Sequence, residues 1–115
     1  MIPDPPLFVL WYDFSKWLLA KTEKFPRKVR FSFTNRIDNL VLDIIEGIVE
    51  ARYAARKQDI LRRIDLSMEK LRIMLRMSHD QHYLDTKGYE YASRQINEAG
   101  KMVGGWRKHE ESRGE

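Results

Sequence analysis

The sequence contains no cysteine, and it has only four prolines and six glycines among its 115 residues. The lack of cysteine excludes a disulfide framework, a cysteine-based zinc site and thiol chemistry. Most of the prolines and glycines fall near the ends of the chain or between periodic segments. Because both residue types interrupt regular structure, this distribution favours a few long helices over many short strands.

Long hydrophobic runs are also missing. The most apolar stretch, LFVLWYDFSKWLLA at residues 7–20, is interrupted by Asp13 and Lys16. A membrane-spanning helix needs about 20 predominantly apolar residues, so this stretch is too short and too charged. It also lacks the basic leader and the small-residue cleavage site of a signal peptide. We therefore expect a soluble cytoplasmic protein with no membrane partner.

No motif for catalysis or phosphate binding is recognisable. His79 and His82 could share a metal ion, but no further ligand is apparent, and a histidine near a helix C-terminus also interacts favourably with the helix dipole. Glu46 and Glu50 could act as paired carboxylates, but the Glu-x-x-His repeats of a di-iron bundle are missing, and salt bridges to a basic third helix are the better interpretation. We accordingly predict a non-enzyme with no catalytic residue, no metal and no cofactor.

Apolar residues recur at helical spacing in four segments, which predict helices at about residues 6–24, 33–55, 57–80 and 86–107. The predicted core positions are Leu7, Trp11, Phe14 and Leu18 in the first segment; Ile37, Leu40, Val41, Ile44, Ile48 and Ala51 in the second; Leu61, Ile64, Met68, Leu71, Leu75 and Ser78 in the third; and Tyr89, Ala92, Ile96, Ala99, Val103 and Trp106 in the fourth. The sequence thus predicts an all-α fold, an up-down-up-down four-helix bundle in one domain over residues 1–115. Gly104 and Gly105 either allow a close approach around Trp106 or begin the end of the last helix, and the polar tail at residues 109–115 is expected to fray.

The predicted helix boundaries depend on local signals. Pro26 ends the first helix near Phe25, Ser32 or Thr34 can cap the second, and the fourth begins at Asp85 or Thr86. No breaker separates the second helix from the third. One continuous helix there would be roughly 65 Å long, more than a small domain could cover, so we expect a tight turn near residues 55–58.

A second apolar row lies outside the predicted core of the second and third helices. It widens the apolar arc of the second helix, and on the third helix it falls nearly opposite the core stripe. Its members are Leu42, Ile45, Val49 and Tyr53 on the second helix and Leu66, Ile73 and Met77 on the third. Either burial is wide and a few apolar residues stay exposed, or the row is a surface for self-association. We favour the second interpretation, an interface of a homo-oligomer.

The net charge of +4 is mild, but the charges are segregated along the chain. Four acids and no base lie between residues 38 and 51, whereas eight bases and three acids lie between residues 52 and 76. We expect part of this separation to produce pairing between helices and the remainder to leave a surface suited to polyanions. The candidate binding residues are Arg27, Lys28, Arg30, Arg36, Arg52, Arg56, Arg62, Arg63, Lys70, Arg72 and Arg76. Six of these bases flank the apolar row of the third helix, so self-association through that row would concentrate their charge.

Four sequence blocks carry a resemblance to a known family. EKFPRKVRFSFTNRID, DIIEGIVEARYA, LRIMLRMSHD and INEAGKMVGGWRK occur in that order. Over about residues 7–108 they resemble the accessory variability determinant (Avd) family of diversity-generating retroelements. The most specific parts are residues 25–31, 50–53 and 104–106.

This resemblance implies both a fold and a role. The Avd family is similar to the S23-type four-helix-bundle proteins encoded by ribosomal RNA intervening sequences. Membership would imply a bundle that assembles into a cyclic homo-oligomer, a pentameric barrel with a basic surface. It would also imply binding to the element's reverse transcriptase and to RNA or DNA, in support of mutagenic copying of template RNA into cDNA. The alternatives are an S23-type RNA- or ribosome-associated bundle without a polymerase partner, and a self-assembling structural protein whose charge serves solubility alone.

The segment from Lys24 to Arg36 carries five bases, no acid and three phenylalanines. On the Avd resemblance, Phe25 ends the first helix, and Phe31 and Phe33 anchor the connection to the core. The bases at residues 27–30 then project from a pinned loop, where they could contact RNA phosphates or an acidic patch on the polymerase. The alternative is a plain helix–helix connection whose arginines cap carbonyls and pair with acids.

Overall fold

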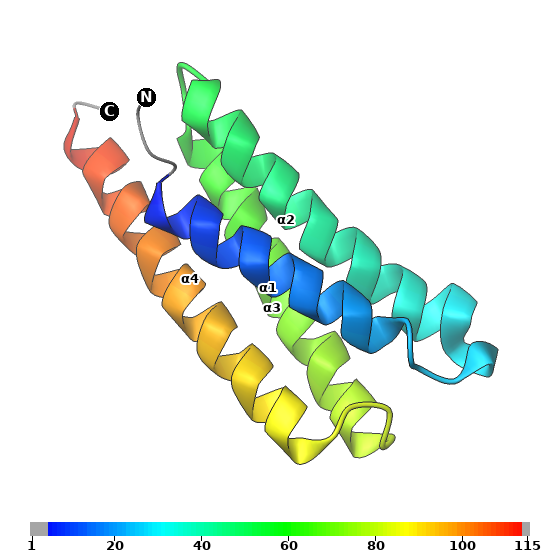
Figure 1. Cartoon of the computed structure of the whole chain (residues 1–115). Helices are drawn as coiled ribbons and strands as arrows, with labels where there is room; N and C mark the ends of the chain where they lie inside the picture. Colours follow the sequence, from blue (N-terminus) through cyan, green and yellow to red (C-terminus); the bar gives the residue numbers. More distant parts are fainter. Residues whose placement is uncertain (1–4, 114–115) are drawn as a thin grey trace.

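A computed structural model describes residues 5–113, and over this range the chain forms four α-helices. The helices are α1 (Pro6–Thr22), α2 (Asn35–Tyr53), α3 (Gln58–Asp80) and α4 (Thr86–Ser112). A 3₁₀ turn at Arg27–Val29 and a π-helical turn at Arg30–Thr34 connect α1 to α2. Successive helices run in opposite directions along a common axis, as Figure 1 shows. The predicted all-α bundle with four helices is confirmed.

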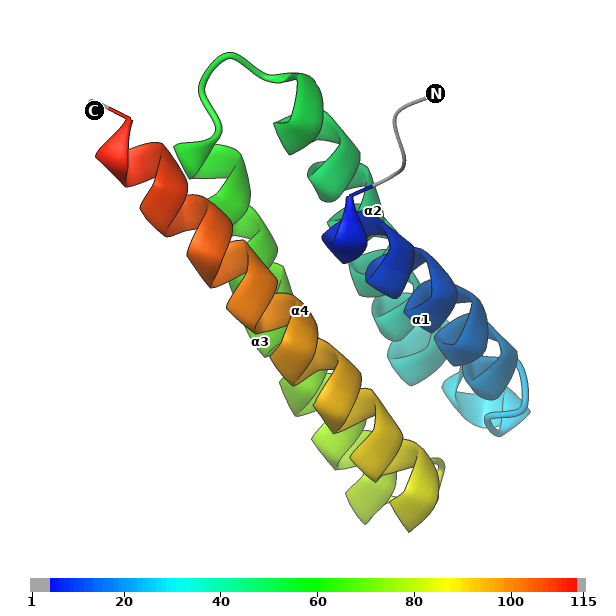
Figure 2. The ribbon, with the colours of Figure 1, turned by 60° about the vertical axis from the view of Figure 1, so that its left-hand side comes forward.

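Each helix packs against two neighbours, with α2 and α4 each lying between α1 and α3. Figure 2 shows the same arrangement from the side, with α3 behind α4 and α2 behind α1. Every predicted core position of α1 and α3 is buried. Those of α2 and α4 are buried as well, apart from Leu40, Tyr89 and Trp106, which are half-buried. The 3.6-residue period therefore identified the core face of all four helices.

Two side-chain hydrogen bonds fix α1 against α2. The fully buried Trp11 donates its indole N–H to the carbonyl oxygen of Val41 at 3.0 Å. One end of the same interface is held by Thr22, whose hydroxyl donates to Asp38 at 2.6 Å. Buried polar groups are costly unless paired, so these contacts set the position of α1 along α2 as well as its distance.

Gly47 allows α2 and α3 to come close together. A Cβ atom at this position would lie 2.9 Å from Cγ1 of Ile64, which is closer than carbon atoms approach. The hydrogen of glycine leaves room for the isoleucine side chain against the α2 backbone. The ion pair between Glu50 of α2 and Arg63 of α3 lies across this close interface.

The turn between α2 and α3 occupies residues 54–57, one residue before the predicted position. Lys57 closes the end of α2, because its Nζ donates to the carbonyl oxygens of Ala51 and Ala54, both at 2.7 Å. A lysine ammonium satisfies carbonyls that a helix C-terminus leaves without intrahelical partners. This cap lets the chain reverse without a glycine or a proline.

The predicted caps at the start of the second helix are wrong. Neither Ser32 nor Thr34 caps α2, and the hydroxyl of Ser32 instead donates to the carbonyl of Val29 at 3.3 Å. The chain is already helical before α2 begins, so the preceding turns occupy the place of a cap. Asp85 does cap α4, where its carboxylate accepts the backbone N–H of Gly88 at 2.7 Å.

The predicted end of the fourth helix is also wrong. Instead of fraying after residue 108, α4 continues to Ser112, and Glu110 is only 6% exposed. Just before this extension, Arg107 pairs with Asp65 of α3 at 2.6 Å. Packing against α3 therefore keeps the last turns helical; the tail residues 114 and 115 lie outside the described range. Added Cβ atoms at Gly104 and Gly105 would meet nothing within 4 Å in the described chain, so neither glycine serves a close approach there.

Among the helices described, none is both long and apolar enough to cross a lipid bilayer.

Candidate nucleic-acid interface

The connection between α1 and α2 is pinned to the end of the bundle. Phe25 and Val29 are each 7% exposed and belong to the core. Tyr83, in the connection from α3 to α4, packs against both Phe25 and Phe33, with ring centroids 5.9 and 5.4 Å away. The two connections therefore hold each other in place. Phe33 anchors the connection as predicted, and Phe25, which was predicted only to end the first helix, is a second anchor.

The prediction that Phe31 also anchors the connection is wrong. Its side chain is 88% exposed, although Val29 is buried and Phe33 is half-buried. The reason is the local helix type, because a 3₁₀ turn followed by a π turn does not advance at the 100° per residue of an α-helix. Phe31 is consequently turned into solvent between two anchored positions.

Four bases follow one another along this connection and the start of α2: Arg27, Lys28, Arg30 and Arg36. All four are exposed. Within residues 5–113, none of them forms a salt bridge or a side-chain hydrogen bond. The alternative of arginines that cap carbonyls and pair with acids therefore finds no support in the described contacts. Their charges remain available to an external anion.

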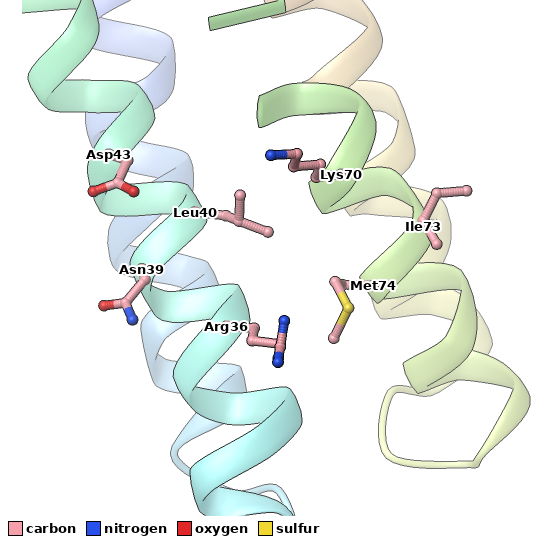
Figure 3. Close-up of a pocket in the computed structure, with 7 residues that line it drawn as sticks. All are labelled: Arg36, Asn39, Leu40, Asp43, Lys70, Ile73 and Met74. Atoms are coloured by element: carbon pink, nitrogen blue, oxygen red, sulfur yellow. The ribbon is translucent and has the colours of Figure 1, made fainter. Parts of the chain in front are cut away.

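A groove of about 460 Å³ lies on the surface between α2 and α3. Arg36 and Lys70 line it, so the basic residues continue from the connection along the side of the bundle. Figure 3 shows Arg36 and Leu40 from α2, and Lys70 and Met74 from α3, projecting toward the space between the helices. Asn39, Asp43 and Ile73 complete the lining. Lys70 also has no ion-pair partner among the described residues. We call Arg27, Lys28, Arg30, Arg36 and Lys70 the basic patch.

The structure neutralises three of the other predicted bases. Arg62 pairs with Asp59 at 3.2 Å, and Arg63 pairs across the helices with Glu50 at 2.8 Å. Arg72 pairs with Glu69 and donates to the side-chain oxygen of Asn97 at 3.3 Å. The predicted pairing between α2 and α3 is confirmed for Glu50. Glu46 forms no salt bridge with any described residue.

The remaining predicted bases lie apart from one another. Arg76 is exposed on α3, about one turn beyond Arg72 toward the end that carries the α1–α2 connection. Arg56 is exposed in the turn between α2 and α3, at the opposite end. Arg52 is half-buried near that turn, with its guanidinium 5.7 Å from the ring centre of Tyr53. The eleven predicted bases are thus not one surface. The basic patch is the group of bases that form no ion pair with a described residue and lie together along the α1–α2 connection and the groove between α2 and α3.

The predicted second apolar row is largely exposed. Its exposed members are Leu42 (40%), Val49 (41%) and Tyr53 (78%) on α2, and Leu66 (56%), Ile73 (50%) and Met77 (45%) on α3, while Ile45 is half-buried against the core. Sequence reasoning missed Val9 and Tyr12 on α1, which are 46% and 48% exposed. Their signal was present, since both fall outside the spacing of the α1 core stripe.

A second hollow, about 390 Å³ and almost wholly apolar, lies at the end of the bundle opposite the α1–α2 connection. The start of α1, the end of α2 and the end of α4 surround it, with Phe8, Val49, Met102 and Trp106 in its wall. Val49 belongs to both this hollow and the apolar row. Nothing in the sequence pattern indicated the hollow, because its walls come from three helices.

Of the two predicted histidines, His79 makes local packing contacts and His82 lies in a turn. The ring of His79 stacks on Tyr89 with centroids 4.8 Å apart, and its Nε2 lies 3.2 Å from the hydroxyl of Thr86. His82 is exposed, with a φ of 66° in the turn that follows α3. Over residues 5–113, no three histidine, aspartate or glutamate side chains are grouped so that they could hold a metal ion.

Comparison with known proteins places the chain. No curated protein and no solved structure matches it. The family model described as bAvd-like matches residues 9–110, a span that contains the pinned connection, the basic patch and the apolar row. The chain therefore belongs to the bAvd-like family, the Avd accessory proteins of diversity-generating retroelements.

Proposed function

We propose that this protein is a non-catalytic accessory factor that binds nucleic acid and the reverse transcriptase of a diversity-generating retroelement. In this role it supports the mutagenic copying of template RNA into cDNA. The basic patch supplies the contact to the phosphate backbone. Family membership supports the retroelement context, and the unpaired charges support the binding.

The observation that carries the proposal is the absence of acidic partners around the basic patch within the described residues. A base that already neighbours a carboxylate gains little from a phosphate, because the two compete for the same charge. An unpaired exposed base releases counterions from the nucleic acid instead, and this supplies most of the affinity for a phosphate backbone. Binding of this kind positions the protein without reading base sequence.

Self-association is the second part of the proposal. The members of the apolar row lie on two different helices, α2 and α3, and all except the half-buried Ile45 are between about 40% and 80% exposed. A contact between two unlike surfaces is heterologous, and copies joined in this way close into a ring when the rotation permits. We infer a cyclic homo-oligomer, with five copies as in the Avd pentameric barrel. Assembly would multiply the basic patch around the ring and strengthen its field.

The direct test replaces the three bases of the connection by glutamate, in the variant Arg27→Glu/Lys28→Glu/Arg30→Glu. The protein is co-expressed with the reverse transcriptase of its own element, and co-purification and RNA binding are both measured. We expect the variant to fold and assemble like the wild type, because none of the three side chains contacts a described residue through a hydrogen bond or salt bridge. RNA binding should fall by at least a hundredfold at low salt, since three attractions become repulsions.

The outcomes separate the two partners. Unchanged RNA binding and unchanged co-purification by the folded variant would leave only a structural role for the connection. RNA binding by the wild type without capture of the polymerase would favour the S23-type alternative, an RNA- or ribosome-associated bundle. No RNA binding by the wild type at low salt would favour the purely structural protein.

A further inference from the structure

Phe31 is the most exposed large apolar side chain among the described residues. An exposed phenylalanine leaves its full hydrophobic contribution unused, because burial of such a side chain is worth about 1.5–3 kcal/mol. Its position is nevertheless well defined. Val29 is buried two residues before it, and Phe33 packs edge-on against Tyr83 two residues after it. The ring is therefore presented to solvent by a backbone that is anchored on both sides.

The surroundings of Phe31 are cationic and polar. Arg30 precedes it and Ser32 follows it, and both are exposed. Arg27 and Lys28 lie on the preceding turn, and neither has an acidic partner among the described residues. The exposed members of the apolar row lie on α2 and α3, not on this connection. Phe31 is thus a single aromatic ring among positive charges and lacks the apolar surroundings typical of a protein–protein hot spot.

We propose that Phe31 stacks on an unpaired base of single-stranded nucleic acid, while the basic patch holds the adjoining phosphates. This inference rests on the proposed function and names the form of nucleic acid that the site takes. An aromatic ring beside a basic track is the arrangement by which proteins bind single strands without sequence preference. In a duplex both faces of each base are covered by its neighbours, so the ring has nothing to stack on. The site therefore favours single strands over duplexes.

Four variants test the chemistry of the ring. Phe31→Ala removes it, Phe31→Leu keeps apolar bulk without a π-face, and Phe31→Trp enlarges the π-face. Tyr12→Ala is the matched control. Tyr12 is an exposed aromatic with a neighbouring cation, Lys16 Nζ at 5.0 Å from the ring centre, and it lies on α1, outside the connection and the apolar row. Each protein is first checked for wild-type helicity and native mass.

Binding is measured by fluorescence anisotropy with labelled 12-nucleotide oligouridine, oligothymidine and a 12-base-pair duplex. Stacking of one base is worth roughly 1–3 kcal/mol, so Phe31→Ala should weaken binding to both single strands by about five- to 150-fold. Phe31→Leu should weaken it almost as much, and Phe31→Trp should preserve or increase it. Duplex binding should change less than twofold in every variant, as should single-strand binding by Tyr12→Ala.

Each result bears on one claim. Equal losses for single strands and duplex, or no loss for either, would overturn the stacking inference and leave the proposed function intact. Wild-type binding of single strands by Phe31→Leu would show that apolar bulk is sufficient, and this would also overturn the stacking inference. Loss of polymerase capture by Phe31→Ala with unchanged RNA binding would make Phe31 a protein anchor. Failure of the wild type to bind any of the three probes at low salt would instead refute the nucleic-acid part of the proposed function. A loss for oligouridine alone or oligothymidine alone would restrict the site to RNA or to DNA.

Discussion

The salt dependence of RNA binding tests whether the basic patch makes phosphate contacts. The perturbation is Arg27→Gln/Lys28→Gln/Arg30→Gln, which removes three exposed positive charges and leaves polar side chains. For a single strand, the logarithm of the binding constant falls with the logarithm of the salt concentration at a slope of about −0.7 for each phosphate contacted. If each of the three bases contacts one phosphate, their removal should make the slope shallower by about 2.

The structure supplies a control with the same change in net charge. Arg62→Gln/Arg63→Gln/Arg72→Gln also removes three positive charges, but each of these arginines already pairs with a carboxylate, on Asp59, Glu50 and Glu69 respectively. We expect its slope to change by less than 1, because paired bases contribute few phosphate contacts. The difference between the variants then reports contact and not net charge.

The assay is anisotropy of a labelled single-stranded RNA, titrated at potassium chloride concentrations from about 50 to 300 mM, a range over which the logarithmic dependence applies. Native mass by light scattering confirms that both variants assemble like the wild type. The reasoning would be refuted by equal slopes in the two variants, or by a wild-type slope that persists without the three bases.

Three further predictions concern assembly and stability. Leu66→Asp combined with Ile73→Asp places two charges on the exposed apolar face of α3. This double variant should keep its helicity and have the native mass of the single 13.8 kDa chain. An unchanged native mass would exclude α3 from the interface. Trp11→Phe should lower the free energy of unfolding by about 2 kcal/mol, since it leaves a cavity and removes the 3.0 Å hydrogen bond to Val41. Urea unfolding at one protein concentration measures this loss. An unfolding midpoint equal to that of the wild type would contradict the prediction. Lys57→Met should cost about 1 kcal/mol in the same assay by uncapping α2, with no effect on native mass.

Much of the fold could be predicted because helical periodicity is a local property. An apolar residue every three or four positions selects one face of a helix, whatever that face later packs against. The buried Trp11, Leu61 and Val103 were identified in this way. The exposed row of α3 was predicted for the same reason, since Leu66 and Ile73 fall opposite the core stripe.

The helix ends were predicted less well, because packing overrides local signals there. Gly104 and Gly105 were predicted either to allow a close approach or to begin the end of the last helix, yet α4 continues beyond them to Ser112. The ion pair of Arg107 with Asp65 joins α4 to α3, and Glu110 is buried after it. A residue 42 positions away along the chain thus takes part in holding the last turns of α4, and no local pattern could show this.

For the candidate site, the sequence by itself determined which residues are basic, that they lie on both sides of an acidic stretch, and which faces of the helices are apolar. The tertiary structure alone decided which of those bases are free. Arg63 is neutralised because α2 places Glu50 within 2.8 Å of it. Lys70, two turns further along α3, lines the groove with Arg36 and Asp43 of α2 but forms no ion pair with a described residue. Pairing depends on what lies across an interface, and that is set by the packing of helices and not by the order of residues.

The same distinction applies to Phe31. Composition placed three phenylalanines in a basic connection, and alternation alone could not tell which of them face inward. The 3₁₀ and π-helical turns set the rotation of each residue, so Phe25 and Phe33 reach Tyr83 while Phe31 is turned into solvent. Those turns exist because Val29 and Tyr83 hold the connection against the end of the bundle, a constraint that only the folded chain provides.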